Sequence, residues 1–191
     1  TPEPDPVSLP ALMQADYNGG DLQLGGVLNR TDAFTAYAVT YRSADLRISG
    51  VLYVPDGTGP FPGVVLNHGY IDPDVSVTGQ GLGLEADYLA RSGFVVLHPD
   101  YRNHAGSDDD PDNDLRLRLG YTEDTLNAVR ALRSSGLESL DPARIGMLGR
   151  SMGGGVTLNA LVVEPRVVDA AVSPSLPRLG TPFTSAARIA A

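Results

Sequence analysis

The chain has 191 residues with no cysteine, no lysine and no tryptophan, and its formal net charge at pH 7 is −9. Without a thiol there is no cysteine nucleophile, no disulfide framework and no cysteine-built metal centre, so a nucleophile has to be an oxygen or a histidine. The negative charge excludes the basic surface that contact with a phosphate backbone requires, so no nucleic acid is expected as a partner.

Hydrophobic residues make up 42% of the chain, which is enough for the core of one domain. No apolar run approaches the roughly 18 residues that a membrane span needs, and the first residues lack the charged and apolar regions of a signal peptide. We therefore expect a soluble protein, either cytoplasmic or secreted after processing. The sequence does not predict an oligomeric state.

The amino-terminal third of the chain contains two segments that differ in composition and pattern. Residues 1–35 are rich in proline, glycine and aspartate, which predicts an irregular extension with little structure of its own. Apolar residues then alternate at Tyr37, Val39 and Tyr41, and a second extended run over 46–54 follows a short turn. This pattern predicts an antiparallel hairpin.

After the hairpin, short apolar strands alternate with helices. Strands are predicted over 63–67, 94–97, 145–148 and 166–172. Helices are predicted over 84–91 and 121–133, and a third follows the glycine-rich run 149–155 and continues through Leu161. The first of these helices is predicted from the spacing of Leu84, Tyr88 and Leu89. Such alternation is typical of an α/β protein with a mostly parallel sheet and helices on both faces.

The last residues, 173–191, contain no acidic residue and match neither a strand nor a helix of such a fold. We therefore divide the chain into an irregular extension (1–35), a sheet-containing domain (36–172) and an atypical tail (173–191). Whether the tail is native, truncated or an out-of-frame reading of the gene stays open at this stage.

The strongest chemical signal is the run Gly149-Arg150-Ser151-Met152-Gly153, which lies between a predicted buried strand and a predicted helix. In that context G-x-S-x-G predicts a sharp turn that exposes a serine hydroxyl at the carboxyl edge of the sheet. The alternative is a glycine-rich turn that packs tightly or binds phosphate, but the lysine of a phosphate-binding loop is absent. We interpret Ser151 as a nucleophile.

Three further segments accompany this motif. They are Asn67-His68-Gly69-Tyr70, Pro99-Asp100-Tyr101-Arg102 and the run from Asp141 to Gly146 that leads toward Ser151. With the serine turn, they resemble the α/β-hydrolase fold and, within it, the prolyl-oligopeptidase-like and acylaminoacyl-peptidase-like hydrolases. The resemblance implies a serine hydrolase that cleaves an ester or peptide bond of a small-molecule substrate through an acyl-enzyme on Ser151, without a cofactor or a metal.

The resemblance also implies an oxyanion hole built from the backbone N–H groups of Met152 and Tyr70. Alternatively, the ring of Tyr70 lines the substrate pocket. In such hydrolases an acid and a histidine follow the serine along the chain. Here His68, His98 and His104 all precede Ser151, and the only acidic residues after it are Glu164 and Asp169, which do not match the family's acid position.

An upstream histidine is a poor substitute for the missing base. His68 and His98 are expected to be packing or loop residues, and His104 is the least implausible replacement. We therefore expect a sheet that is incomplete at its carboxyl end, with the base and the acid on a segment absent from this chain. Low or no activity is expected for the chain alone. The alternative is a non-catalytic, hydrolase-like binding or interaction module.

The acidic run 108–114 invites interpretation as a calcium site, but it lacks the turn glycine and distal glutamate of an EF-hand loop. A solvated loop is expected instead. Asp100 and Arg102 are expected to take part in a hydrogen-bonding scaffold at the edge of the sheet.

Overall fold

The structure is a computed structural model that describes residues 3–173 and 188–190. Its helices are α1 (Leu9–Leu12), the 3₁₀ helix η1 (Pro73–Val75), α2 (Gly83–Arg91), α3 (Gly120–Arg133) and α4 (Met152–Val163). Its strands are β1 (Gly20–Arg30), β2 (Phe34–Ser43), β3 (Leu46–Pro55), β4 (Phe61–Asn67), β5 (Val95–Pro99), β6 (Leu140–Gly149), β7 (Ala170–Val172) and β8 (Arg188–Ala190).

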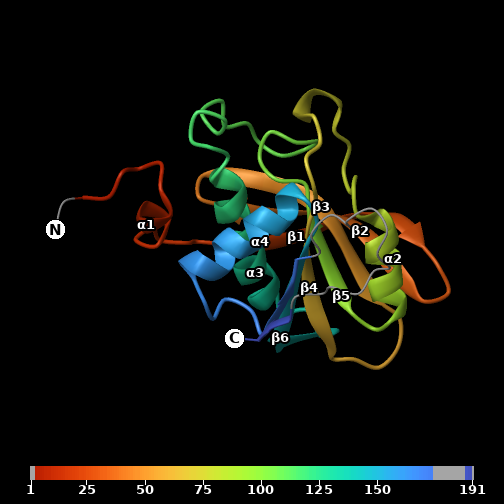
Figure 1. The fold of residues 1–191 in the computed structure, drawn as a ribbon. Helices are drawn as coiled ribbons and strands as arrows, with labels where there is room; N and C mark the ends of the chain where they lie inside the picture. Colours follow the sequence, from red (N-terminus) through yellow and green to blue (C-terminus); the bar gives the residue numbers. More distant parts are fainter. Residues whose placement is uncertain (1–2, 174–187, 191) are drawn as a thin grey trace, which may run out of the picture.

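The described strands form one mixed sheet in the order β1-β2-β3-β5-β4-β6-β7-β8 (Figure 1). Strands β5, β4, β6 and β7 pair in parallel, while β1, β2 and β3 form an antiparallel meander at one side. Strand β3 joins the two parts by pairing antiparallel with β5. The predicted α/β class, the hairpin and the parallel centre are therefore confirmed.

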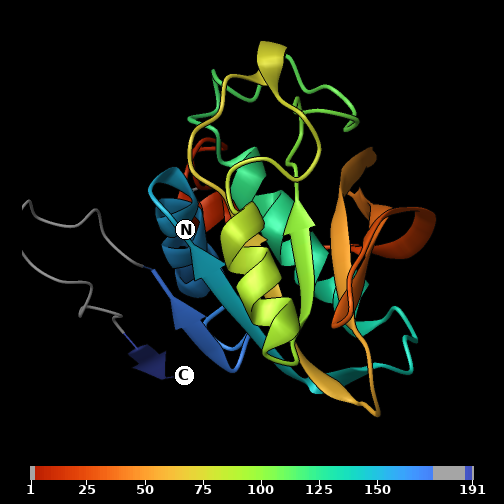
Figure 2. The same cartoon turned by 90° about the vertical axis from the view of Figure 1, so that its right-hand side faces the viewer.

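Helices cover both faces of this sheet, as the alternating pattern predicted. Helices α3 and α4 pack together on one face, and α2 packs on the opposite face over β3 and β5 (Figure 2). The larger hydrophobic core lies beneath α3 and includes Leu126, Val129 and Leu132. A smaller core beneath α2 includes Leu66, Ala86 and Val96. The middle segments of the central strands, such as 63–66 and 95–97, are apolar because both of their faces are buried.

The prediction for residues 1–35 is wrong for 20–30, which form strand β1. This strand pairs antiparallel with β2, from Gly20 opposite Arg42 to Arg30 opposite Thr35, with irregularities in its register. Its residues are almost all exposed because it lies at the edge of the sheet. An exposed edge strand does not need an alternating apolar pattern, so its sequence reads as a loop.

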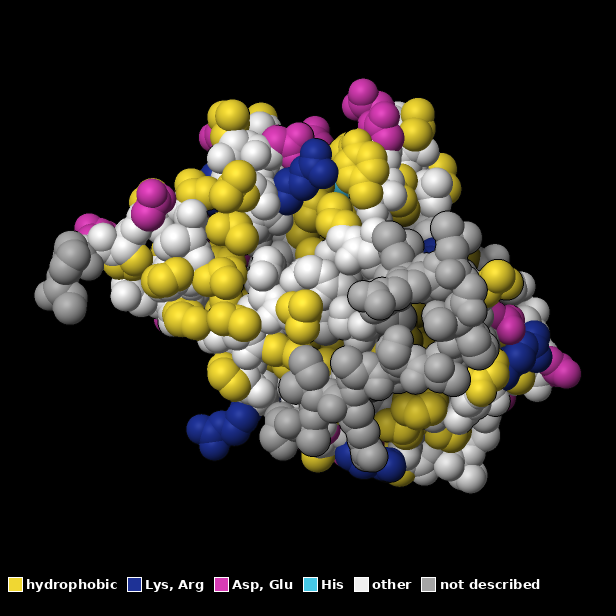
Figure 3. Space-filling view, viewed as in Figure 1, with side chains coloured by type: hydrophobic (Ala, Val, Ile, Leu, Met, Phe, Trp, Pro, Cys, Tyr) yellow, Lys and Arg dark blue, Asp and Glu magenta, His cyan; other side chains and the backbone are white. Residues whose placement is uncertain are grey.

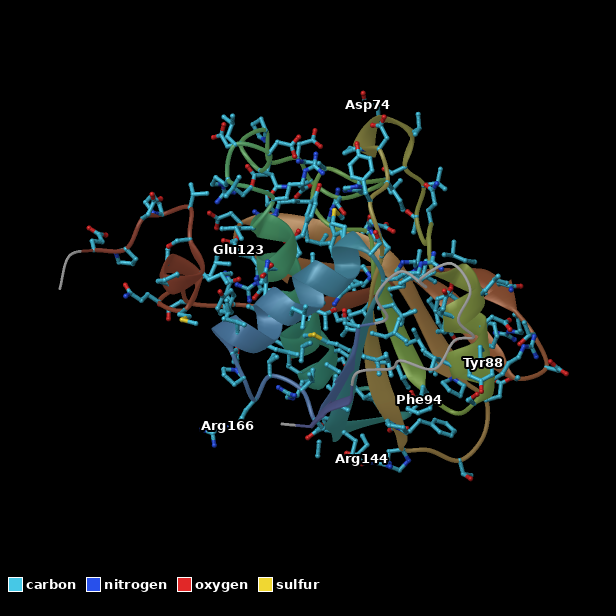
Figure 4. All side chains as sticks on the ribbon, viewed as in Figure 1. Asp74, Tyr88, Phe94, Glu123, Arg144 and Arg166 are labelled. Atoms are coloured by element: carbon cyan, nitrogen blue, oxygen red, sulfur yellow. The ribbon has the colours of Figure 1, made fainter. Side chains whose placement is uncertain are left out.

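Helix α2 exists where it was predicted, but a different face meets the core. Leu84 and Tyr88 are 86% and 71% exposed, whereas Ala86 and Ala90 are fully or nearly fully buried. Figure 4 shows Tyr88 on this helix. The small alanine side chains face the sheet, and the partly buried Leu89 packs against the same core. The spacing of the large residues therefore indicates the helix correctly, although two of the three face solvent.

The proposed tail, 173–191, lies mostly outside the described residues, apart from Ser173 and strand β8, which pairs antiparallel with β7. In the part of the chain that the structure describes, no helix is both long and apolar enough to cross a membrane.

The loop after β5 is fastened to helix α3 by the buried guanidinium of Arg102. Its Nη2 lies 2.8 Å from Asp124 Oδ1 and 2.8 Å from Glu123 Oε2, and its Nη1 lies 2.9 Å from Asp110 Oδ2. The Asp124 carboxylate also accepts hydrogen bonds from Ser43 Oγ and from the backbone N–H of Arg102. The expected scaffold at the sheet edge is therefore present.

Replacing Arg102 with methionine should lower the free energy of unfolding by about 3–5 kcal/mol, because Asp124 then stays buried without its partner. Urea unfolding followed by circular dichroism measures the change. The matched control is Arg47→Met, since Arg47 forms an exposed ion pair with Asp108 at 3.3 Å and its loss should cost about 0–1 kcal/mol. Equal losses in the two variants would contradict a special role for the buried pair.

Candidate active site

Ser151 occupies the sharp turn between β6 and α4. Its backbone angles are φ 57° and ψ −122°, a conformation that costs a non-glycine residue free energy and persists only where the surroundings impose it. The residue is exposed to solvent. The turn therefore presents the hydroxyl at the carboxyl edge of the parallel strands.

Close backbone contacts impose this conformation, and they explain both glycines of the motif. A Cβ atom at Gly153 would overlap the carbonyl oxygens of Asn67 and His68. A Cβ atom at Gly149 would overlap the Gly153 carbonyl and the Thr157 hydroxyl. The backbone N–H of Arg150 donates to Asn67 O at 3.1 Å, which closes the turn against strand β4.

Asn67, the last residue of β4, connects this turn to both helices of the same face. Its Nδ2 donates to Thr157 Oγ1 at 2.8 Å, and its Oδ1 accepts from Thr125 Oγ1 at 3.0 Å. Thr157 Oγ1 donates in turn to Gly153 O at 2.8 Å. All three polar side chains are buried, so this network holds β4, α3 and α4 in one arrangement.

The loop after β4 lies directly beside the serine. A Cβ atom at Gly69 would lie 3.3 Å from Ser151 Cβ and 3.8 Å from its Oγ, so the absence of a side chain leaves space there. Tyr70 follows, with its ring 57% exposed and covered by the Arg118 guanidinium at 5.1 Å. Met152 is the first residue of α4, where backbone N–H groups have no intrahelical acceptor.

Arg150, inside the motif, makes contacts that the sequence did not predict. Its Nη1 lies 2.7 Å from Glu85 Oε1, and its Nη2 donates to the carbonyl of Gly81. The serine turn is thereby tied to the start of α2 on the opposite face of the sheet. No sequence pattern signals this pairing, because the two residues are 65 positions apart.

None of the three histidines hydrogen-bonds to Ser151. His68 and His104 are buried, and each places both ring nitrogens against backbone carbonyls. His98 is fully buried, and neither of its ring nitrogens has a partner in the described part of the chain. His68 and His98 are therefore loop-supporting and packing residues, as expected, and His104 is not positioned to replace the base.

The two acidic residues after Ser151 also have structural partners. Glu164 pairs with Arg130 at 2.6 Å, and Asp169 Oδ2 accepts from the backbone N–H of Ile145 at 2.9 Å. Both contacts lie near the ends of the elements that they connect, away from the serine turn. Within residues 3–173, the serine turn therefore has neither the histidine nor the acid of a triad.

Loops with hydrophobic and acidic side chains rise above the serine turn. Figure 3 shows these side chains together at the top of the molecule, and Figure 4 shows Asp74 at the tip of the loop after β4. The loop after β4 and the loop after β5 expose several large apolar residues, namely Tyr70, Val75, Val77, Leu115 and Leu117.

The acidic run 108–114 is a solvated loop, as expected, with Asp109, Asp112 and Asp114 exposed. Some of its aspartates also pair with arginines, which the sequence did not predict. Asp108 pairs with Arg47, Asp110 with Arg102 and Arg116, and Asp114 with Arg118. No cluster of three or more metal-ligating side chains was found in the described ranges.

A parallel sheet whose carboxyl edge carries a strained serine turn leading into a helix is the arrangement that defines α/β hydrolases. Residues 62–189 match the α/β hydrolase fold family, and the chain belongs to that family. The prolyl-oligopeptidase-like subgroup expected from sequence is not specifically supported.

Individual relatives are esterases and thioesterases. The chain is 30% identical over 124 residues to esterase EstD of Thermotoga maritima, covering 62% of this chain and 29% of that protein. It is 35% identical over 114 residues to the mitochondrial acyl-coenzyme A thioesterase 2 of Homo sapiens, covering 59% of this chain and 20% of that protein. Acetyl xylan esterase 1 of Thermoanaerobacterium has a similar structure, with a TM-score of 0.64 and 22% identity. The match covers 86% of this chain and 55% of that protein.

These similarities establish membership of the α/β hydrolase fold family. The chain spans between 20% and 40% of the length of the curated relatives it matches.

Replacing Gly153 with alanine should destabilise the protein by about 1–3 kcal/mol, because the new methyl group overlaps two carbonyl oxygens. Chemical denaturation measures the change. Gly155→Ala in the same helix is the matched control, since a Cβ there meets no atom within 4 Å, and it should stabilise by about 0.5–1 kcal/mol. Tolerance of alanine at 153 would show that the turn is not held by this contact.

The buried His98 should make the protein less stable in acid. Burial lowers the pKa of His98 from 6.5 to about 3. Between these values the unfolded ring binds a proton that the folded ring does not, so the free energy of unfolding falls as the pH falls, by up to about 1.4 kcal/mol per unit.

The measurement is urea unfolding at several pH values between 4 and 7 for the wild type and for His98→Leu. The difference in unfolding free energy between the two proteins should move in favour of the variant as the pH is lowered. A difference that is independent of pH would contradict the neutral, buried ring.

Proposed function

We propose that the chain carries the nucleophile of a serine esterase, which forms an acyl-enzyme on Ser151. The observation that supports this most strongly is the strained conformation of Ser151, with φ 57° and ψ −122°, at an exposed turn. Glycine contacts on both sides maintain that strain, and strained residues held in this way cluster at functional sites.

In the proposed reaction, Ser151 Oγ attacks the carbonyl carbon of the ester, and the π electrons of the C=O bond move to its oxygen. The backbone N–H groups of Met152 and Tyr70 bind the resulting oxyanion. Each such donor contributes roughly 3–4 kcal/mol to transition-state stabilisation. Collapse of the intermediate expels the alcohol, and water then hydrolyses the acyl-enzyme.

A serine hydroxyl needs a general base to take its proton. His68 and His104 contact backbone carbonyls, and His98 is fully buried without a partner in the described residues. We therefore assign the base and its acid partner to a part of the protein outside the described residues. The base returns the serine proton to the leaving alcohol. The partial coverage of the curated relatives is consistent with that assignment.

An ester is favoured over a peptide as the substrate. The relatives bear the names of esterases, thioesterases and cutinases. The loops above Ser151 expose several large apolar side chains and carry acidic residues, including Asp72, Asp74 and Asp109. Such surroundings suit an uncharged ester with an apolar part and repel polyanionic substrates.

A fluorophosphonate probe should label Ser151, and added imidazole should accelerate labelling because it supplies the absent base. Intact-mass spectrometry and peptide mapping follow the reaction. Ser151→Ala should remove the label, whereas Ser134→Ala, which removes the serine after helix α3, should keep it.

Absence of labelling in a folded protein, with imidazole present, would contradict the proposal. That result would instead favour the non-catalytic, hydrolase-like binding module, since the turn would then have only a structural purpose.

A further inference from the structure

The peptide group between Gly69 and Tyr70 is contacted on its carbonyl side by His68. The Nδ1 atom of His68 lies 2.7 Å from Gly69 O, and its Nε2 atom lies 3.0 Å from Asp100 O. The imidazole is 2% exposed and packs on the Tyr101 ring, with 4.4 Å between ring centroids. The ring is thus fixed between the loop after β4 and the end of β5.

In a trans peptide the C=O and the next N–H point in opposite directions, because the group is planar. Holding the Gly69 carbonyl against His68 therefore also determines the direction of the Tyr70 N–H. Gly69 lies beside the Ser151 side chain, so this N–H belongs to the backbone segment nearest the serine.

We propose that His68 is a positioning residue, whose Nδ1–H donates to Gly69 O and thereby directs the Tyr70 N–H toward the oxyanion. This inference rests on the proposed function, since it concerns the same oxyanion hole. His68 does not touch the reacting atoms and acts only through the peptide group that it holds.

The hydrogen bond requires a particular tautomer. Burial lowers the pKa of His68, which favours the neutral ring with one N–H, although two carbonyls face its two nitrogens. The nitrogen without a proton then opposes a carbonyl lone pair, and this repulsion is smaller at 3.0 Å than at 2.7 Å. The proton therefore belongs on Nδ1, opposite Gly69.

His104 is equally buried but contacts other peptide groups. Its Nδ1 lies 2.9 Å from Arg102 O, and its Nε2 lies 3.1 Å from Ile71 O. Neither contact is with the Gly69 carbonyl, so His68 is the histidine that holds the Gly69–Tyr70 peptide.

The first test is the tautomer of His68 in the wild-type chain, from long-range ¹H–¹⁵N correlations of ¹⁵N-labelled histidine. The three ring systems are assigned by comparison with His68→Asn, His98→Leu and His104→Asn. A His68 ring protonated at Nδ1 alone supports the inference, and a ring protonated at Nε2 alone overturns it. This measurement does not depend on any activity.

The second test is the rate at which a fluorophosphonate labels Ser151 in the presence of imidazole. Asparagine at 68 places its Nδ2 near the position of Nδ1, so His68→Asn should stay within about threefold of the wild type. His68→Leu should lose at least about tenfold, because one oxyanion donor is no longer held in place. The control His98→Leu should resemble the wild type, because the ring nitrogens of the buried His98 have no hydrogen-bond partner in the described residues.

A merely structural role for His68 predicts that the asparagine and leucine variants slow labelling equally, and that result overturns the inference. The Tyr70 amide resonance provides a further readout. It should shift on phosphonylation in the wild type and His68→Asn but not in His68→Leu. If the wild type is not labelled at all, the proposed function fails, while the tautomer measurement still decides the hydrogen bond of His68.

Discussion

The close approach of helix α4 to strand β4 at Gly153 is the constraint on which the rest of the site depends. Backbone meets backbone there, so no side chain is tolerated at Gly153, and the turn before the helix has no room to relax. Ser151 is consequently held at positive φ. The strain is maintained by packing, with Asn67 and Thr157 satisfying the polar groups that this close approach buries.

A second set of contacts positions the loops that surround the serine. The buried Arg102 fastens the loop after β5 to helix α3, and His68 and His104 then bridge that loop to the one after β4. Buried ion pairs are weak sources of net stability, but removing one partner is strongly destabilising because it leaves an uncompensated buried charge. The ion pairs of Arg102 thus hold the loop after β5 in place above the apolar core.

Much of the architecture was predictable because the spacing of apolar residues along the chain indicates which positions are buried. The buried segments of the central strands are apolar on both faces. The motif around Ser151 can be recognised from the predicted strand before it and the predicted helix after it. Strand β1 was not predictable, since an exposed edge strand lacks a pattern. The buried face of α2 was also misjudged, because alanines face the sheet there while Leu84 and Tyr88 face solvent.

The sequence by itself determined the fold class, the family resemblance and the identity of the nucleophile candidate, because each is encoded in local patterns. Only the tertiary structure decided the rest: the contact of Arg150 with Glu85, the pairing of aspartates of the acidic run with arginines, and the burial of all three histidines away from Ser151. These contacts join residues far apart in the chain, and their partners are chosen by packing, for which no local pattern exists.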